Sequence, residues 1–146
     1  MDKLEKLQVI DSSGCHRYQY WNEQFLFDGR EDTGWCSPSR SKWVNEYLII
    51  DLGASVKPKK IRMLSRAINE NAGFPQALEI YLSDDAKYWE LIFKIENIQN
   101  QKSTWHEWLF DNNKMCKFVK ILITKVGKRK EKKYFTQFMG LEIYTE

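Results

Sequence analysis

The sequence contains no long apolar run, few glycines and prolines, and only three cysteines. Its 146 residues include no stretch of about 18 consecutive apolar residues, so a membrane-spanning helix is excluded. Its 7 glycines and 3 prolines are too few for a collagen-like or low-complexity chain. The cysteines Cys15, Cys36 and Cys116 are odd in number and far apart, a pattern that indicates neither a disulfide framework nor a zinc site.

Targeting and catalytic signals are also missing from the sequence. The first residues, MDKLEKLQVIDSS, have no apolar segment typical of a secretory signal, and no Asn-x-Ser/Thr sequon occurs. We therefore expect a cytoplasmic or nuclear protein if the chain is complete, and an extracellular one if it is a module of a longer protein. The HExxH, GxSxG and GxGxxG motifs of common enzyme classes are absent, which argues against catalysis.

The composition is that of a folded, strand-rich protein. Hydrophobic residues make up 42% and charged residues 29%, which fits one globular domain over residues 1–146. Aromatic residues, at 14%, favour β-strands. Apolar runs predict about eight strands, at residues 7–10, 47–52, 60–64, 78–82, 89–95, 105–110, 118–124 and 138–144.

Turn signals separate these runs, for example at residues 52–54 and 83–85, and only residues 22–27 favour a helix. Many short strands divided by turns are typical of sandwiches and jelly rolls. The sequence therefore predicts an all-β fold, in which the N-terminal and C-terminal segments can pair with each other.

Several segments resemble the motifs of one family, in the same order. Residues 27–35 (FDGREDTGW) resemble the DG-x-x-x-T-x-W element of discoidin domains, also called coagulation-factor or F5/8 type C domains. Residues 47–53 (YLIIDLG), 80–89 (IYLSDDAKYW), 117–121 (KFVKI) and 141–144 (LEIY) resemble later elements of that family. The family includes family 32 carbohydrate-binding modules. The resemblance implies an eight-stranded antiparallel jelly-roll β-sandwich of the galactose-binding-like type, with ligand-binding loops at one end.

The resemblance also implies a candidate calcium site beside the DG turn. Its side-chain ligands would be Asp28, Thr33 and Glu142, with backbone oxygens of Arg30 and Asp32. Oxygen ligands from a tight turn suit calcium, although two carboxylates are few for a tight site. In the alternative interpretation, Asp28 caps the turn, Thr33 occupies a strand and Glu142 forms a salt bridge.

A second candidate site lies on the loops at the ligand end. The resemblance places Arg66 and Asn71 in the loop that reads sugar hydroxyls, and the neighbouring loops supply aromatic and polar side chains. These further candidates are His16, Tyr20, Trp21, Tyr134 and Phe135. A sugar packs its C–H face on an aromatic ring, while a fork of donors binds its hydroxyls. Alternatively, Tyr20 and Trp21 pack under the first loop and Arg66 forms a surface ion pair.

A basic segment stands out in a chain whose formal net charge is only +3. Residues 125–133 hold six basic residues and one acidic residue. The candidates for contact with an anionic surface are Lys128, Arg129, Lys130, Lys132 and Lys133. Phospholipid headgroups, nucleic acid or an acidic protein are possible partners, and the segment also fits a nuclear-localisation patch or a solvated hairpin tip.

The function expected from these observations is a non-catalytic ligand-binding module that binds carbohydrate through loops at one end of the sandwich. The alternative is an intracellular module that binds a protein or an anionic surface through residues 125–133. The sequence indicates neither the ligand nor the oligomeric state.

Overall fold

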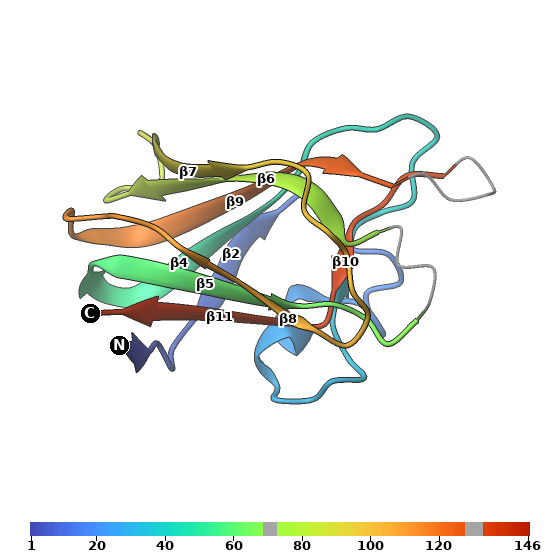
Figure 1. Ribbon diagram of the computed structural model, residues 1–146, viewed down its shortest axis with the longest axis horizontal. Helices are drawn as coiled ribbons and strands as arrows, with labels where there is room; N and C mark the ends of the chain where they lie inside the picture. The colour runs from blue at the N-terminus through green and yellow to red at the C-terminus, as the bar shows by residue number, and fades with distance from the viewer. Residues whose placement is uncertain (69–72, 128–132) are drawn as a thin grey trace.

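Two antiparallel β-sheets pack against each other in the computed structural model, which describes residues 1–68, 73–127 and 133–146 (Figure 1). The larger sheet has the strand order β2 (Gln8–Ser12), β4 (Glu46–Val56), β9 (Cys116–Val126), β6 (Pro75–Ser83) and β7 (Glu90–Ile95). The smaller sheet has the order β1 (Asp2–Lys3), β11 (Gly140–Thr145), β5 (Pro58–Leu64) and β8 (Trp105–Leu109). Two short strands, β3 (Trp35–Cys36) and β10 (Gln137–Phe138), pair with each other, and η1 (Glu23–Phe27) is a 3-10 helix. The expected all-β sandwich is thus confirmed.

The alternation of side chains along the long strands builds the core between the sheets. In β4, Leu48 and Ile50 are buried, and in β9 Val119 and Ile121 are buried in the same way. Ile61 of β5 joins the same cluster from the smaller sheet. Burying one such side chain stabilises the fold by about 1.5–3 kcal/mol, so the core depends on keeping this two-residue period.

Each predicted strand is present, and the differences lie in their ends. The run 138–144 is divided at Met139 into β10 and β11. Strands β1 and β3 were not expected, because two residues are too short to show a periodic pattern. Asp2 and Lys3 of β1 pair with Thr145 and Tyr144 of β11, so the two terminal segments of the chain do pair.

The turn expected at residues 52–54 is wrong, because β4 continues through it to Val56. Gly53 has a φ of +84°, and the pairing of β4 with β9 shifts in register between Asp51 and Val56. An irregular pairing with a glycine in the left-handed region is a bulge, which bends a strand without ending it. Gly53 therefore marks a bulge within β4 and not the predicted turn.

The helical segment expected at residues 22–27 is present as η1, which begins one residue later. The side chain of Asn22 precedes it as an N-cap and accepts a hydrogen bond from the backbone N–H of Gln24 at 2.9 Å. Among the described residues, no helix has the length and apolarity needed to cross a membrane.

Candidate ligand-binding site

Two adjoining cavities lie among the loops at one end of the sandwich, around β3 and β10, and the chain termini lie at the other end (Figure 1). The first, which we call the inner cavity, has a volume of about 320 Å³. It is bordered by His16, Trp21, Cys36, Ser37, Ser39, Arg66, Lys133, Phe135 and Gln137. Segments far apart in the sequence therefore meet here, among them four of the residues that the resemblance proposes for a ligand site.

At the inner cavity, Arg66 contacts Trp21 and Gln137. Its guanidinium group lies over the ring of Trp21, with its central carbon 4.9 Å from the ring centroid. One of its nitrogens, Nη1, donates a hydrogen bond to Oε1 of Gln137 at 3.4 Å. Gln137 is 3% exposed on β10, so the amide that receives Arg66 is itself fixed by the fold. These contacts position a planar fork of donors, which suits paired oxygen atoms of a ligand.

Gly73 lies against Phe135, one of the residues that border the inner cavity. A Cβ atom at position 73 would lie 2.8 Å from Cε2 of Phe135, so a side chain here would displace the ring. The carbonyl of Gly73 accepts hydrogen bonds from the backbone N–H of Gln137 and from the hydroxyl of Thr136, both at 2.9 Å. The loop after β5 is thereby attached to the approach to β10. Asn71, the second residue expected to read hydroxyls, lies outside the described residues.

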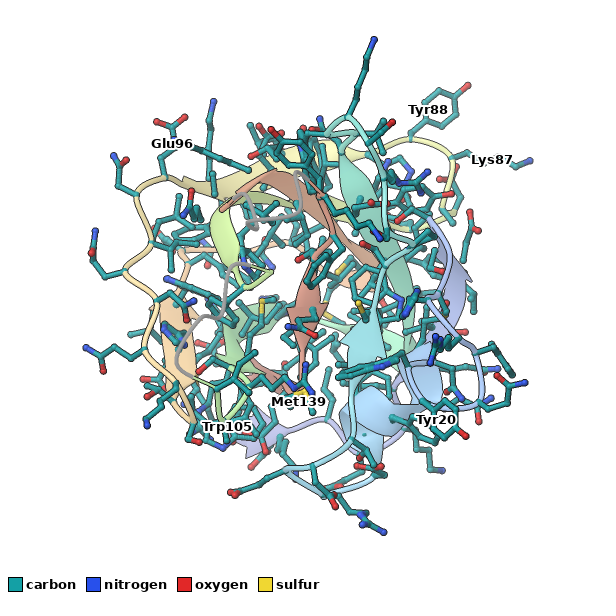
Figure 2. All side chains as sticks on the ribbon, turned by 90° about the vertical axis from the view of Figure 1, so that its right-hand side faces the viewer. Tyr20, Lys87, Tyr88, Glu96, Trp105 and Met139 are labelled. Atoms are coloured by element: carbon teal, nitrogen blue, oxygen red, sulfur yellow. The ribbon has the colours of Figure 1, made fainter. Side chains whose placement is uncertain are left out.

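The first loop, residues 13–22, is attached to β3 and then makes a tight turn. The backbone N–H of His16 donates to the carbonyl of Cys36 at 2.8 Å. Arg17 has a φ of +45°, and its carbonyl accepts from the backbone N–H groups of Tyr20 and Trp21 at 2.8 and 3.2 Å. The turn leaves Tyr20 68% exposed at the rim of the end that faces the viewer in Figure 2.

Asn22 closes this turn from behind. Its side-chain amide donates to the carbonyl of Tyr18 at 3.1 Å, while its carbonyl oxygen caps η1 through Gln24. Asn22 is itself buried, so one side chain links the turn that carries Tyr20 to the start of η1.

The second cavity, which we call the outer cavity, lies on the other side of this turn and has a volume of about 490 Å³. It is bordered by His16, Arg17, Gln19, Tyr20, Trp21, Phe25, Asp32 and Thr33. His16 and Trp21 border both cavities and form the wall between them. Asp32 is paired with Arg30, with Nε and Nη2 of the arginine at 2.9 and 2.8 Å from the two carboxylate oxygens. This bidentate pair lowers the pKa of Asp32 below its usual range, so its carboxylate is ionised at neutral pH.

Tyr134 contributes less to the cavities than expected. The backbone of Tyr134 pairs with that of Arg40 in both directions at 2.9 Å, and its side chain packs against the core. Lys133 borders the inner cavity. The other residues predicted to contact an anionic surface lie outside the described residues: Lys128, Arg129, Lys130 and Lys132. That alternative function stays a prediction.

A buried ion pair that the sequence did not reveal supports the loops. Glu46, at the start of β4, has a fully buried side chain, and Arg40 donates to its two carboxylate oxygens at 2.8 and 3.0 Å. Nη2 of Arg40 also donates to the carbonyl of Ser13 at 3.2 Å. The hydrogen bond to Glu46 raises the pKa of Arg40 above its usual value. One side chain thus links the first loop and β4, and its backbone holds the segment before β10.

Two of the candidate calcium ligands, Asp28 and Thr33, contact each other, whereas the third, Glu142, pairs with cationic side chains. Oδ1 of Asp28 accepts from the backbone N–H of Arg30 at 2.9 Å, and Oδ2 accepts from the hydroxyl of Thr33. Glu142 borders a cavity of about 310 Å³ that also touches Gly29 next to Asp28. The oxygens therefore fit calcium in kind.

The carboxylate of Glu142 already has cationic partners. Nη1 of Arg62 lies 2.7 Å from one oxygen and Nζ of Lys3 lies 3.7 Å from the other. Within residues 1–68, 73–127 and 133–146, no three His, Cys, Asp or Glu side chains are grouped so that they could hold a metal ion. A calcium ion would have to share Glu142 with these cations and take most of its ligands from the backbone.

The thiols of Cys15 and Cys116 are not activated as nucleophiles. Burial, with a smaller contribution from a hydrogen bond to Glu23, raises the pKa of Cys15 to about 12. Burial likewise raises the pKa of Cys116 to about 11. Since the thiolate is the reactive form, both groups are almost entirely unreactive at neutral pH.

The comparisons with known proteins agree with this architecture. A family model described as F5/8 type C domain matches residues 8–138. The chain is similar to CpGH89CBM32-5 from Clostridium perfringens, in complex with GalNAc-β-1,3-galactose, at 17% identity and a TM-score of 0.80, covering 99% of this chain and 100% of that one. It is also similar to the family 32 carbohydrate-binding module of Clostridium perfringens NanJ in complex with galactose, at 16% identity and a TM-score of 0.78, covering 97% and 96%.

A further similar structure is chitosan-binding module 1, derived from a chitosanase/glucanase of Paenibacillus sp. IK-5. Here the identity is 16% and the TM-score 0.70, and the alignment covers 97% of this chain and 95% of that one. Comparison with curated protein sequences finds no match. Because the family model spans most of the sequence, the chain belongs to the F5/8 type C domain family.

Proposed function

We propose that the protein is a non-catalytic carbohydrate-binding module whose ligand occupies the inner cavity. The observation that carries the proposal is the position of Arg66, fixed between Trp21 and Gln137 at a cavity with further polar side chains. A guanidinium fork beside serine and histidine side chains matches the neighbouring hydroxyls of a pyranose. The similar structures in complex with galactose and with a galactose-containing disaccharide support the same ligand class.

The wall residues add an apolar side to this polar cavity. Phe135 is only 9% exposed and borders the cavity from below, and Trp21 borders it from the first loop. Ligand sites commonly combine an apolar lining with a few convergent polar groups. The binding of a sugar here requires no catalytic group, and none is assigned.

The test is a titration with a defined saccharide panel by calorimetry. The panel holds galactose, N-acetylgalactosamine and glucosamine, together with β-linked disaccharides and trisaccharides of each. We expect Arg66→Ala to weaken binding by at least about tenfold, because it removes hydrogen bonds from a charged donor, with little change in melting temperature. Asn71→Ala tests the other predicted hydroxyl-binding residue in the same way.

A matched control is Lys94→Ala, which removes an exposed cation from β7 in the larger sheet. This variant should bind every saccharide as the unaltered protein does. If no member of the panel binds, or if Arg66→Ala binds as tightly as the control, the proposed site is wrong.

The calcium prediction is tested separately by thermal melting with calcium and with a chelator. A ligand that binds only the folded state raises the melting temperature. We infer that any rise is small, because Glu142 already lies beside Arg62 and Lys3. Asp28→Ala should abolish a calcium-dependent rise, and equal melting temperatures in calcium and chelator would remove the site from the proposal.

A further inference from the structure

The inner and outer cavities adjoin each other, because His16 and Trp21 border both of them. Trp21 has Arg66 over one part of its ring on the inner side and borders the outer cavity as well. A ligand that extends from the inner cavity past Trp21 would enter the outer cavity, which Tyr20 also borders. Their volumes of about 320 and 490 Å³ each lie toward the lower part of the range of about 300–1,000 Å³ that is usual for ligand sites.

The two cavities offer different chemistry, and neither alone offers all that a saccharide uses. In the inner cavity the aromatic rings are less accessible, since Arg66 lies over half-buried Trp21 and Phe135 is only 9% exposed and lies against Gly73. Its contribution is mainly hydrogen bonding. The outer cavity is bordered by the ring of Tyr20, which is 68% exposed, and by Phe25. A pyranose stacks its C–H face on a ring that solvent can reach, so stacking belongs to the outer cavity.

Polar groups for a second sugar are also present in the outer cavity. Asp32 supplies carboxylate oxygens, which accept hydrogen bonds from hydroxyls, and Thr33 adds a hydroxyl whose proton is directed to Asp28. Arg30 holds Asp32 in a bidentate pair, so the orientation of the carboxylate is fixed. The outer cavity therefore combines an exposed aromatic ring with oriented oxygen atoms.

The exposure of Tyr20 is built into the first loop. The carbonyl of Arg17 accepts two backbone hydrogen bonds within the turn, and the side chain of buried Asn22 donates to the carbonyl of Tyr18 in the same turn. The backbone that carries the Tyr20 ring is thus already ordered before a ligand binds. A preorganised turn lowers the entropic cost of binding, which is the condition under which one stacked ring contributes measurably to affinity.

We propose that the outer cavity is a second saccharide subsite, so that the ligand is an oligosaccharide of at least two sugar rings that crosses Trp21. The first ring binds in the inner cavity through Arg66, and the next stacks on Tyr20. This inference rests on the proposed function, because it takes the inner cavity as the first subsite.

The experiment compares monosaccharides with the disaccharides and trisaccharides of the panel, using the unaltered protein and Tyr20→Ala. The unaltered protein should bind the best disaccharide at least about tenfold more tightly than the monosaccharide it contains. Tyr20→Ala should reduce the affinity for the disaccharide to near that for the monosaccharide, a larger loss than it causes for the monosaccharide itself. Tyr20→Phe keeps the ring and should retain most of the difference.

Tyr18→Ala is the matched control, because Tyr18 lies in the same turn, is 62% exposed and contacts Asn22 only through its backbone carbonyl. It should bind both ligand lengths as the unaltered protein does. Equal affinity for short and long saccharides, or an equal loss for both in Tyr20→Ala, would overturn the second subsite while leaving the function intact. Absence of binding to every saccharide would instead overturn the function and the subsite together.

Discussion

Two ion pairs of the molecule use the same chemistry in different surroundings. At the loop end, Arg40 binds both carboxylate oxygens of Glu46, whose side chain is 0% exposed. On the smaller sheet, Arg62 of β5 lies 2.7 Å from Glu142 of β11, whose side chain is 20% exposed. In the first pair the carboxylate is fully buried although Arg40 is 31% exposed, and the second pair is part of a row of charges near solvent.

The surroundings decide what each arginine contributes. The carboxylate of Glu46 is inaccessible to solvent, and Arg40 supplies the compensating positive charge. Glu142 has Lys3 as a second cation and accepts a hydrogen bond from the hydroxyl of Tyr144 at 3.0 Å. A buried charge that loses its partner is strongly destabilising, whereas a charge near solvent is rehydrated. The comparison therefore predicts a graded series of effects on stability.

The largest effect should come from Arg40→Met, which leaves Glu46 buried without its partner. We expect a loss of about 3–5 kcal/mol in the free energy of unfolding, measured by chemical denaturation. The double variant Arg40→Met/Glu46→Leu removes both charges and should recover most of that loss. A single-variant loss below about 1 kcal/mol would show that the interior tolerates the free carboxylate, contrary to the burial of Glu46.

Arg62→Met should have a smaller effect, because Glu142 keeps Lys3 and Tyr144 as partners. We expect a loss of about 1 kcal/mol, part of it from the contact of the guanidinium with the ring of Trp105, whose centroid lies 4.8 Å away. The measurement is again denaturation, at low and high salt, since the screened part should disappear with salt. A loss as large as that of Arg40→Met would contradict the comparison.

The sandwich could be predicted from the sequence because its signal is local and repeated. Leu78, Ile80 and Leu82 alternate with polar or half-exposed neighbours, and each is buried in β6 as that pattern requires. The bulge at Gly53 could not be distinguished from a turn, since both need a residue with positive φ.

The candidate site was predictable only in part. The resemblance pointed to Arg66 and Trp21, which the structure brings into contact, but gave no sign of Gln137, which fixes Arg66. Gln137 lies in a two-residue strand whose pairing with β3 depends on segments a hundred residues apart, and such pairing leaves no periodic pattern. The ion pair between Arg40 and Glu46 could not be predicted either, because its importance depends on the burial of the Glu46 carboxylate, which the sequence does not show.

The smallest effect on stability belongs to a third pair, Arg30 with Asp32, which is fully exposed on the turn after η1. Arg30→Met should leave the melting temperature unchanged, since exposed pairs contribute little. Its effect should instead appear in an NMR pH titration. The hydrogen bonds from Arg30 hold the pKa of Asp32 below its usual range, so the variant should titrate at higher pH.

Asp85 provides the internal control for that titration, because backbone N–H groups of Tyr88 and Lys87, and no arginine, lower its pKa. Its titration should be the same in both proteins. A carboxyl whose pKa is lowered in the folded state stabilises the fold at pH values above its unfolded-state pKa, and this stabilisation is lost as the pH falls through the folded-state pKa. For a fully exposed carboxyl such as Asp32, screening by solvent removes nearly all of this stabilisation. An unchanged titration of Asp32 in Arg30→Met would mean that the pair does not persist in solution, and would remove the fixed carboxylate from the outer cavity.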